Sequence, residues 1–487
     1  MAILTPYSPI YYNITSKQTK SNIVLHSTSH NTLEILLHKR VIGILSLLLS
    51  LWLILIDPVI NNDAIIYLRT ADIFLREGLA ESFLLFDRPL LPIAIALIHK
   101  FSGLSLQHSG QLLTSLAYML LCLSFVALIK QLGGNQRVQL FAMVIILCHP
   151  IINNYRSSIM RDPGFWAFSL LSLLELIRYS DKQKLKHRLR WWFYTGMALL
   201  FRFEAILFLT IAPFGLFLSM HQRIGLRLEA FLKLLLPAVT FLICSLASLI
   251  FWLDLSLDKL FPHITLYAAK LIDFEQHLTK VSFAVGEILL NHSAQEDAGY
   301  AAIFGLIGIF SLNLFRAFML PFITIGIVGW WYAVWTPIKR GQNRLIFTYI
   351  SISILYLLVF TIINRFMLER YCTLLVILLL TYVPFILDHY WQHAQKNRKI
   401  LMQGLIIGLL VITTIDSIHN TDYKKAYMVE ATNWVKSHTP KNSTLIANDK
   451  TLAYFSDRKV DWNVKQNQKL GKILTSGLWR KHQYLLI

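Results

Sequence analysis

The chain has 487 residues, of which 55% are hydrophobic and only 15% are charged, and its formal net charge is +19. Soluble domains carry about 25% charged residues, whereas the apolar residues here recur in runs along almost the whole chain. This composition excludes an ordinary soluble protein and indicates a polytopic membrane protein, whose positive charge belongs to loops facing anionic lipid and not to a nucleic-acid partner.

The first residues are polar and rich in Ser, Thr and Asn, and no small-residue cleavage site follows the first apolar run. We therefore predict a cytoplasmic N-terminal tail over 1–40 and a retained first helix over 41–56, instead of a cleaved signal peptide. Lys39 and Arg40, just before this helix, place the N-terminus inside.

Further along the chain, Lys and Arg cluster in short segments that the positive-inside rule places in the cytoplasm. They lie near 130–137, 182–190, 223–233, 339–344 and 396–399. The pattern predicts about eleven crossings within a transmembrane domain over 41–415. The predicted crossings are 41–56, 111–129, 138–151, 164–178, 192–201, 205–219, 234–253, 317–336, 345–363, 371–390 and 400–415.

Two apolar runs, 89–101 and 298–315, do not fit the alternation of sides. If either crossed alone, a strongly basic loop would face outward, so we predict that both are interfacial or re-entrant on the outer side. A helical hairpin over 89–129 is an alternative that would change the number of crossings.

The segment after the first helix contains Asp63, followed by Tyr67, Ala71 and Phe74 at helical spacing. This spacing predicts an amphipathic helix along the outer membrane surface, with Asn62 as its cap. The helix dipole alone favours an acidic residue in the first turn. The functional alternative is that Asp63 serves as a general base or orients an acceptor hydroxyl.

Two later outward turns also carry charge. Arg161 and Asp162 precede a proline, which is typical of a helix start, but they also place a second carboxylate on the same face as Asp63. Arg202 and Glu204 interrupt an apolar stretch. These two side chains either pair with each other or neighbours, or the arginine binds a phosphate.

A last outward cluster contains Arg365, Glu369, Arg370 and Tyr371. Arginine at an outer membrane edge opposes the positive-inside trend. We therefore interpret these arginines as ligands for an anionic group.

The four cysteines, Cys122, Cys148, Cys244 and Cys372, lie inside apolar runs without the spacing of a disulfide framework or zinc site. We expect them to be small core residues, and we predict no metal site from the sequence.

The polar tail, 416–487, is predicted to form a small α/β segment outside the membrane. One helix should place Ala431, Trp434 and Val435 on a single face. The stretch STLIAND reads as a buried strand, LAYFSDRKVDW as further strand, and the final YLLI also as strand.

The order of these elements resembles the GT-C superfamily of membrane glycosyltransferases over about residues 41–455. It is most similar to the bacterial branch that contains the aminoarabinose transferase and protein O-mannosyltransferase relatives. The matching motifs are the acidic Asp63 after the first helix, the Pro-containing Arg88–Pro92, the acidic Asp162, the turn Arg202–Glu204 and the pair Arg370–Tyr371.

Two positions depart from the family pattern. Many relatives have two adjacent acidic residues at the first site, where Asn62 precedes a lone Asp63 here, and many have proline where Phe203 stands. Asp63 alone would therefore carry the first role.

The resemblance implies an all-α, GT-C-like membrane protein that transfers a sugar from a polyprenyl-phosphate-linked donor. The acceptor, a glycan, lipid or protein, would lie on the outer, periplasmic face of a bacterial inner membrane, with the C-terminus on that face. It implies catalytic roles for Asp63 and Asp162. The implied substrate-binding residues are Tyr67, Arg88, Arg161, Arg202, Glu204, Arg365, Arg370 and Tyr371. The resemblance implies no cofactor with certainty, and the need for a divalent metal stays open.

Three alternatives share some of these features. A transporter or flippase for a lipid-linked sugar would also need an outer cavity and arginines. An O-antigen ligase or polymerase usually has a large outer loop late in the chain, whereas the sizeable loops predicted here are early and central. A structural membrane protein would not need the outward Arg and Asp cluster.

Overall fold

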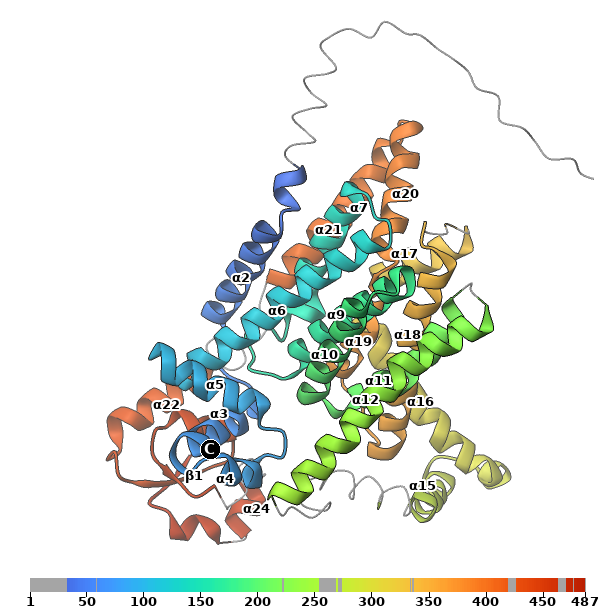
Figure 1. Cartoon of the computed structure of the whole chain (residues 1–487). Coiled ribbons are helices and arrows are strands. Elements are labelled where there is room, and N and C mark those ends of the chain that lie inside the picture. Colours follow the sequence, from blue (N-terminus) through green and yellow to red (C-terminus); the bar gives the residue numbers. More distant parts are fainter. Residues whose placement is uncertain are drawn as a thin grey trace, which may run out of the picture.

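A computed structural model of the chain describes residues 33–57, 59–220, 223–253, 269, 274–332, 334, 337–418, 426–462, 470–475 and 477–486. Most of the predicted cytoplasmic tail and residues 254–268 of the predicted central outer loop lie outside these ranges. The described part is largely helical (Figure 1). This architecture confirms the prediction of an all-α membrane protein with a small α/β segment at its end.

The long apolar part of the chain forms the main helical domain. Its α-helices are α2 (Lys39–Ile56), α3 (Asn62–Glu77), α4 (Leu79–Leu85), α5 (Leu90–Ser102), α6 (Leu106–Gln131), α7 (Gln136–Cys148), α8 (Pro150–Asn153), α9 (Asp162–Lys182), α10 (Leu185–Phe201), α11 (Ile206–Ser219), α12 (Ile224–Leu253), α15 (Phe274–Ile288), α16 (Ala298–Phe318), α17 (Leu320–Trp331), α18 (Arg340–Asn364), α19 (Glu369–Leu380), α20 (Val383–Lys396) and α21 (Ile400–Ile418).

The prediction of about eleven crossings is wrong. Among the described residues, five helices are long and apolar enough to cross a membrane, and a sixth candidate is the bent pair α19–α20. The five are Lys39–Ile56, Leu106–Gln131, Ser293–Phe318, Arg340–Asn364 and Ile400–Ile418. Several other predicted crossings coincide with helices too short for a straight span, such as the 13-residue α7 and the 12-residue α17.

The segment 298–315, predicted to be interfacial or re-entrant, is instead part of the continuous helix α16, which has the length and hydropathy of a span. The predicted crossing 317–336 is correspondingly only the short helix α17. Met319, with a positive φ of 66°, separates the two helices. Because α16 packs on α19 and α17 packs on α20, the two broken helix pairs run side by side.

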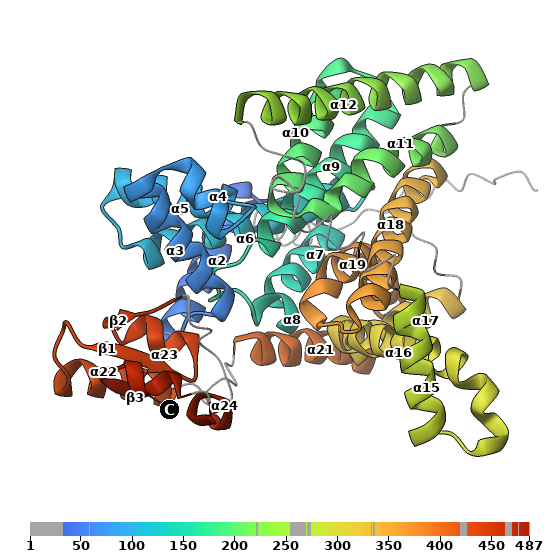
Figure 2. The same cartoon turned by 90° about the horizontal axis from the view of Figure 1, so that it is seen from below.

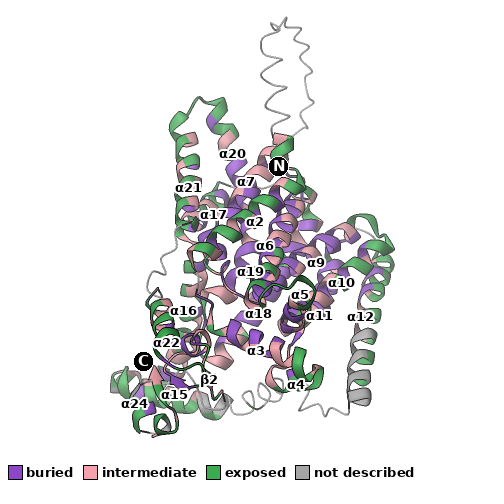
Figure 3. Ribbon diagram, turned by 90° about the vertical axis from the view of Figure 1, so that its left-hand side faces the viewer, coloured by how far each residue is buried: buried purple, intermediate pink, exposed green. Residues whose placement is uncertain are grey.

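Buried side chains gather in the middle of the domain, on α6, α9 and α19, whereas α21 presents exposed residues to the outside (Figure 3). Helix α9 is buried along most of its length but contains Glu175, whose carboxylate binds Arg178 and His187. These polar residues explain why α9 lies in the core without having the composition of a membrane span. Cys122 and Cys372 are buried as predicted, but Cys244 is exposed.

The amphipathic helix predicted after the first crossing is α3. Tyr67 and Ala71 are buried, and Phe74 packs against the core. The N-cap is Asn61 and not Asn62, and it makes no side-chain cap hydrogen bond. Asp63 therefore lies in the first turn, as the sequence predicts.

The end of the chain forms a three-stranded parallel sheet with helices. Its elements are α22 (Ala426–His438), β1 (Thr444–Ala447), α23 (Lys450–Phe455), β2 (Lys459–Val460), α24 (Leu470–Thr475) and β3 (Tyr484–Leu486), with strand order β2-β1-β3. We call residues 426–486 the C-terminal domain. The first and last predicted strands are confirmed, but LAYFSDRKVDW forms α23 and only a two-residue strand. Val435 is buried, whereas Trp434 is 59% exposed and does not share its face.

The C-terminal domain lies beside α3 (Figures 1 and 2). In Figure 1 it is at the opposite end of the molecule from the start of α2 and from the loops that join α6 to α7 and α20 to α21. The first helix therefore runs from one end of the molecule toward the other.

Candidate functional site

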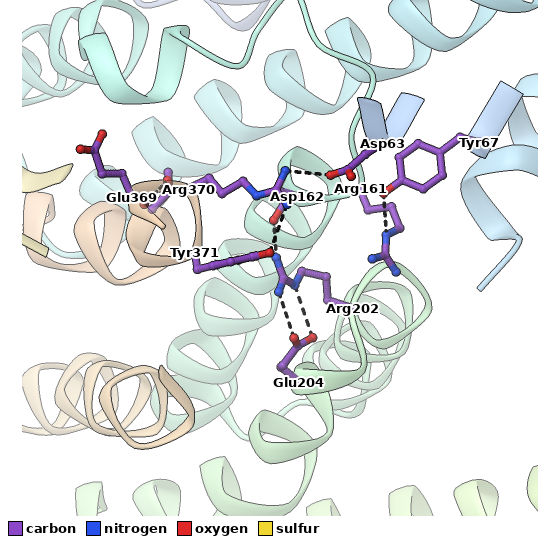
Figure 4. A network of polar contacts seen from close by, with 10 residues as sticks. Asp63, Tyr67, Arg161, Asp162, Arg202, Glu204, Glu369, Arg370 and Tyr371 are labelled. Carbon is purple, nitrogen blue, oxygen red and sulfur yellow. Dashed lines mark hydrogen bonds and ion pairs between the residues drawn. The ribbon is translucent and has the colours of Figure 1, made fainter. Parts of the chain in front are cut away.

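Charged residues from four predicted outward segments come together in one cluster (Figure 4). Asp63 lies in the first turn of α3, and Asp162 lies in the first turn of α9. Arg202 caps the C-terminal end of α10, and Glu204 follows in a short 3-10 helix, η1 (Phe203–Ala205). Arg370 lies in the first turn of α19. The cluster is thus assembled from helix ends that are far apart in the sequence.

Arg202 binds two carboxylates at once. It donates to Glu204 through Nη2 at 2.9 Å and through Nε at 3.3 Å, and its Nη1 donates to Asp162. The guanidinium carbon also lies 5.1 Å from the ring centre of Tyr371 and 5.7 Å from that of Phe165, within the range of cation–π attraction. These contacts join the α10–α11 turn to α9 and α19.

Arg202 and Glu204 stabilise each other's charged forms. Burial by itself would lower the pKa of Arg202, but the carboxylates of Glu204 and Asp162 outweigh it and raise that pKa above its ordinary value. Burial would likewise raise the pKa of Glu204, but Arg202 outweighs it and lowers that pKa to about 2. Arg202 and Glu204 are therefore ionised at physiological pH, and Arg202 acts as an anchor between elements.

Asp63 forms an ion pair with Arg370, with 2.8 Å between Oδ2 and Nη1. Its side chain is 42% exposed, compared with 10% for Asp162 and 23% for Glu204. Arg370 also donates from Nη2 to the Tyr371 hydroxyl at 3.1 Å, while its buried Nε has no hydrogen-bond partner among the residues that the structure describes. Asp63 is thus the most accessible carboxylate of the three, and its partner retains an unused donor.

Arg161 has no carboxylate partner among the described residues. Its Nε donates to the Tyr67 hydroxyl at 3.2 Å, and its guanidinium carbon lies 5.1 Å from the ring centre of Phe86. Its Nη1 is buried and has no hydrogen-bond partner within the described part of the chain. A buried charged donor without an acceptor is unfavourable, so this atom has the capacity to bind an anion.

Tyr67 supports Arg161 as a neutral phenol. Burial raises the pKa of Tyr67, although the positive charge of Arg161 acts in the opposite direction. The neutral hydroxyl can accept from Arg161 without cancelling its charge.

The two remaining predicted arginines lie differently. Arg88 pairs with Asp87 at 3.6 Å, and its charge contributes to lowering the pKa of Glu204, so it lies near the cluster. Arg365 ends α18 in a left-handed conformation with φ of 58° and is exposed. Within the described ranges, no ion pair joins Arg365 to the cluster.

Two polar residues that the sequence did not assign to the site fix its position. The side-chain oxygen of Asn61 accepts from the backbone nitrogen of Ile159 at 3.1 Å, which ties the residues before Asp63 to those before Asp162. Arg156 is fully buried and donates at 3.0–3.2 Å to Ser46 and Ser50 of α2. The sequence places Arg156 a few residues before Asp162 but does not show its structural partners.

The C-terminal domain reaches the edge of the cluster. The Thr451 hydroxyl donates to the side-chain oxygen of Asn62 at 3.0 Å, directly before Asp63. Further along α3, the guanidinium carbon of Arg69 lies 4.4 Å from the ring centre of Trp462. The C-terminal domain is therefore held to α3, the helix that presents Asp63.

In the described part of the chain, no group of three or more His, Cys, Asp or Glu side chains is arranged to hold a metal ion. The cluster instead combines three carboxylates, Asp63, Asp162 and Glu204, with the three guanidinium groups of Arg161, Arg202 and Arg370 (Figure 4).

No protein-family model matches the chain, and no curated protein is significantly similar to it in sequence. The resemblance to the GT-C superfamily therefore depends on the motifs alone and stays a prediction. The assignment to membrane proteins depends on the apolar helices instead.

Proposed function

We propose that this chain is a membrane glycosyltransferase that transfers a sugar from a polyprenyl-phosphate-linked donor to a glycan, lipid or protein acceptor. The observation that carries this proposal is the combination of an accessible carboxylate, Asp63, with two guanidinium groups, Arg161 and Arg370. Each of these keeps a buried N–H donor that has no partner among the described residues. Sugar transfer from a lipid phosphate needs both a group that takes up the acceptor proton and a group that stabilises the departing phosphate.

Arg161 and Arg370 are the arginines best suited to the donor phosphate. Each retains an N–H donor, and Arg161 has no carboxylate to compete with an incoming anion among the described residues. Guanidinium groups bind phosphate oxygens through charge-assisted hydrogen bonds. Arg202, whose guanidinium binds two carboxylates, serves to position the site instead.

In the proposed reaction, the acceptor oxygen attacks the anomeric carbon of the sugar. The bond from that carbon to the phosphate oxygen breaks as the new glycosidic bond forms, and its electron pair leaves on the polyprenyl phosphate. Asp63 takes up the acceptor proton, and Arg161 and Arg370 stabilise the phosphate. Asp162, bound to Arg202, supports the geometry through that pair rather than by direct proton transfer.

The proposed location is the periplasmic side of a bacterial inner membrane, with the N-terminus in the cytoplasm. Two observations support this orientation: the basic loops between α6 and α7 and between α20 and α21 lie at one end of the molecule, and the C-terminal domain lies at the other (Figure 1). Basic loops favour the cytoplasmic side.

The test uses purified protein in detergent, a panel of radiolabelled polyprenyl-phosphate sugars and a membrane extract as acceptor. The decisive variant is Asp63→Asn. Its matched control is Asp72→Asn, on the same helix and with the same change in charge, because Asp72 pairs only with Arg76 at the surface among the described residues. A parallel reaction with a chelator determines whether a divalent metal takes part.

We expect transfer by the wild type and by Asp72→Asn, and its loss in Asp63→Asn with donor binding retained. Equal transfer by Asp63→Asn would remove Asp63 from the mechanism. Saturable donor binding without transfer in the wild type, together with movement of the lipid across reconstituted vesicles, would favour a flippase instead.

A further inference from the structure

We infer that the chain has a second anion site, independent of the proposed function, that holds the phosphate headgroup of an anionic phospholipid between α10 and α12. The site is a cavity of about 230 Å³ lined by residues of α9, α10 and α12 and the α9–α10 connection. Its lining residues include Arg188, Glu229, Lys233, Leu185 and Leu226. It lies at the end of α10 away from Arg202.

The walls of this headgroup cavity are fixed by contacts between the two helices. The indole nitrogen of Trp192 on α10 donates to the carbonyl oxygen of Leu234 on α12 at 2.9 Å. The guanidinium carbon of Arg188 lies 5.2 Å from the ring centre of the same tryptophan. The cation is thus held by an aromatic ring beside the cavity.

Arg188 is the group that would bind the anion. Its Nε is buried and has no hydrogen-bond partner among the described residues. Lys233 is already paired with Glu229 on the next turn of α12. Among the described residues, no ion pair joins Arg188 to a carboxylate, so a phosphate oxygen would satisfy its unused donor.

The surroundings favour a lipid over a free anion. Leu185 and Leu226, which line the cavity, are 55% and 48% exposed, and Leu189 on the next turn of α10 is 50% exposed. Apolar side chains beside a polar cavity match a ligand with a charged head and hydrocarbon chains. Basic pockets between membrane helices bind such anionic headgroups.

The positive charge around the cavity also favours an anionic lipid. The segment 182–190 contains several Lys and Arg residues, and 223–233 contains three more. These residues attract an anionic membrane surface generally, whereas the cavity supplies one defined position for a headgroup.

The experiment measures lipid binding to delipidated, purified full-length protein by native mass spectrometry. Phosphatidylglycerol is titrated against phosphatidylcholine with the same acyl chains, and inorganic phosphate is tested separately as a competitor. The variants are Arg188→Gln and Glu229→Gln. The matched control is Lys186→Gln, which removes one exposed positive charge from the same segment without lining the cavity.

We expect the wild type to retain one phosphatidylglycerol in preference to phosphatidylcholine. Loss of the charge-assisted hydrogen bond in Arg188→Gln should weaken this binding by about tenfold or more, and Lys186→Gln should leave it unchanged. Glu229→Gln should strengthen binding because it releases Lys233 for the phosphate, and this gain is informative even if Arg188→Gln does not fold.

Three results would overturn the inference. One is equal affinity for the two lipids. Another is an equal loss in Arg188→Gln and Lys186→Gln, which would indicate diffuse electrostatic attraction only. The last is displacement of the lipid by inorganic phosphate at low concentration, since that would identify a free-anion site.

Discussion

Arg202 offers the sharpest test of how the candidate site is held together. Replacing it by methionine keeps most of the side-chain volume but removes the only cation bonded to both Asp162 and Glu204 among the described residues. The Asp162 side chain is 10% exposed and that of Glu204 is 23% exposed, so neither carboxylate can be fully hydrated in place. The variant should therefore be strongly destabilised.

The size of the effect follows from the two pairs. Removing one partner of a buried ion pair costs about 3–5 kcal/mol because the other charge stays buried and unpaired. Glu204 is partly hydrated, so its unpaired charge adds less to this cost. We therefore expect the free energy of unfolding to fall by about 3–4 kcal/mol, and not by twice that value. Neutralising both carboxylates in the triple variant with Asp162→Asn and Glu204→Gln should restore most of the loss.

The free energy of unfolding can be measured in mixed micelles by denaturing-detergent titration with tryptophan fluorescence. Arg76→Met is the matched control, because the Arg76–Asp72 pair is exposed and contributes less than about 1 kcal/mol. One refuting outcome is that Arg202→Met is as stable as Arg76→Met. The other is that the triple variant is less stable than Arg202→Met.

The same group makes a prediction about pH. Since the folded protein holds the pKa of Glu204 below its ordinary value of 4.5, the associated stability is present above that value and is lost only as the pH falls toward about 2. Wild-type protein should therefore lose no stability through Glu204 between about pH 8 and pH 5, and Glu204→Gln should be uniformly less stable across that window.

Three further substitutions probe the frame around the site. Arg156→Met should lower the free energy of unfolding by about 2–4 kcal/mol, because hydroxyls of α2 lose a buried charged donor; denaturing titration measures it. Gly164→Ala would place a methyl group 2.5 Å from the Phe201 ring, forcing α9 and α10 apart, and should cost about 1–3 kcal/mol by the same titration. Trp462→Ala removes the ring that contacts Arg69 and should make the C-terminal domain more sensitive to limited proteolysis.

The sequence predicted the long apolar helices well and the number of crossings poorly. Helices α2, α6, α18 and α21 follow from uninterrupted apolar runs of sufficient length. A window of hydropathy cannot show where a helix breaks, and both the 44° bend between α19 and α20 and the break at Met319 occur within apolar sequence. The segment 298–315 was assigned incorrectly because the alternation of basic loops, and not its own apolar length, decided the prediction.

The composition of the cluster was predictable, but its pairing was not. Arginine and acidic residues at outward helix ends, such as Asp63 and Arg370, indicated a common face. Ionisable side chains are costly inside the membrane, so they are expected to gather where they pair with one another. Which cation binds which carboxylate depends on tertiary packing, and the sequence left open whether Arg202 pairs with its neighbours or binds a ligand. Arg365 has the same sequence signal as Arg370, but it is exposed at the left-handed end of α18 and, among the described residues, forms no ion pair with the cluster.

The two ion pairs of the cluster respond differently to an incoming phosphate. Arg202 is held by two carboxylates, so an anion would have to displace both. Among the described residues, Arg370 forms an ion pair with one carboxylate, Asp63, whose side chain is 42% exposed, and its Nε is still unused. A donor phosphate binding at Arg370 would therefore compete with Asp63 and release its carboxylate at the moment the acceptor needs a base. On the proposed mechanism, this exchange couples donor binding to activation of the acceptor, and it predicts that Arg370→Gln loses turnover as well as donor affinity, whereas Arg161→Gln loses mainly donor affinity.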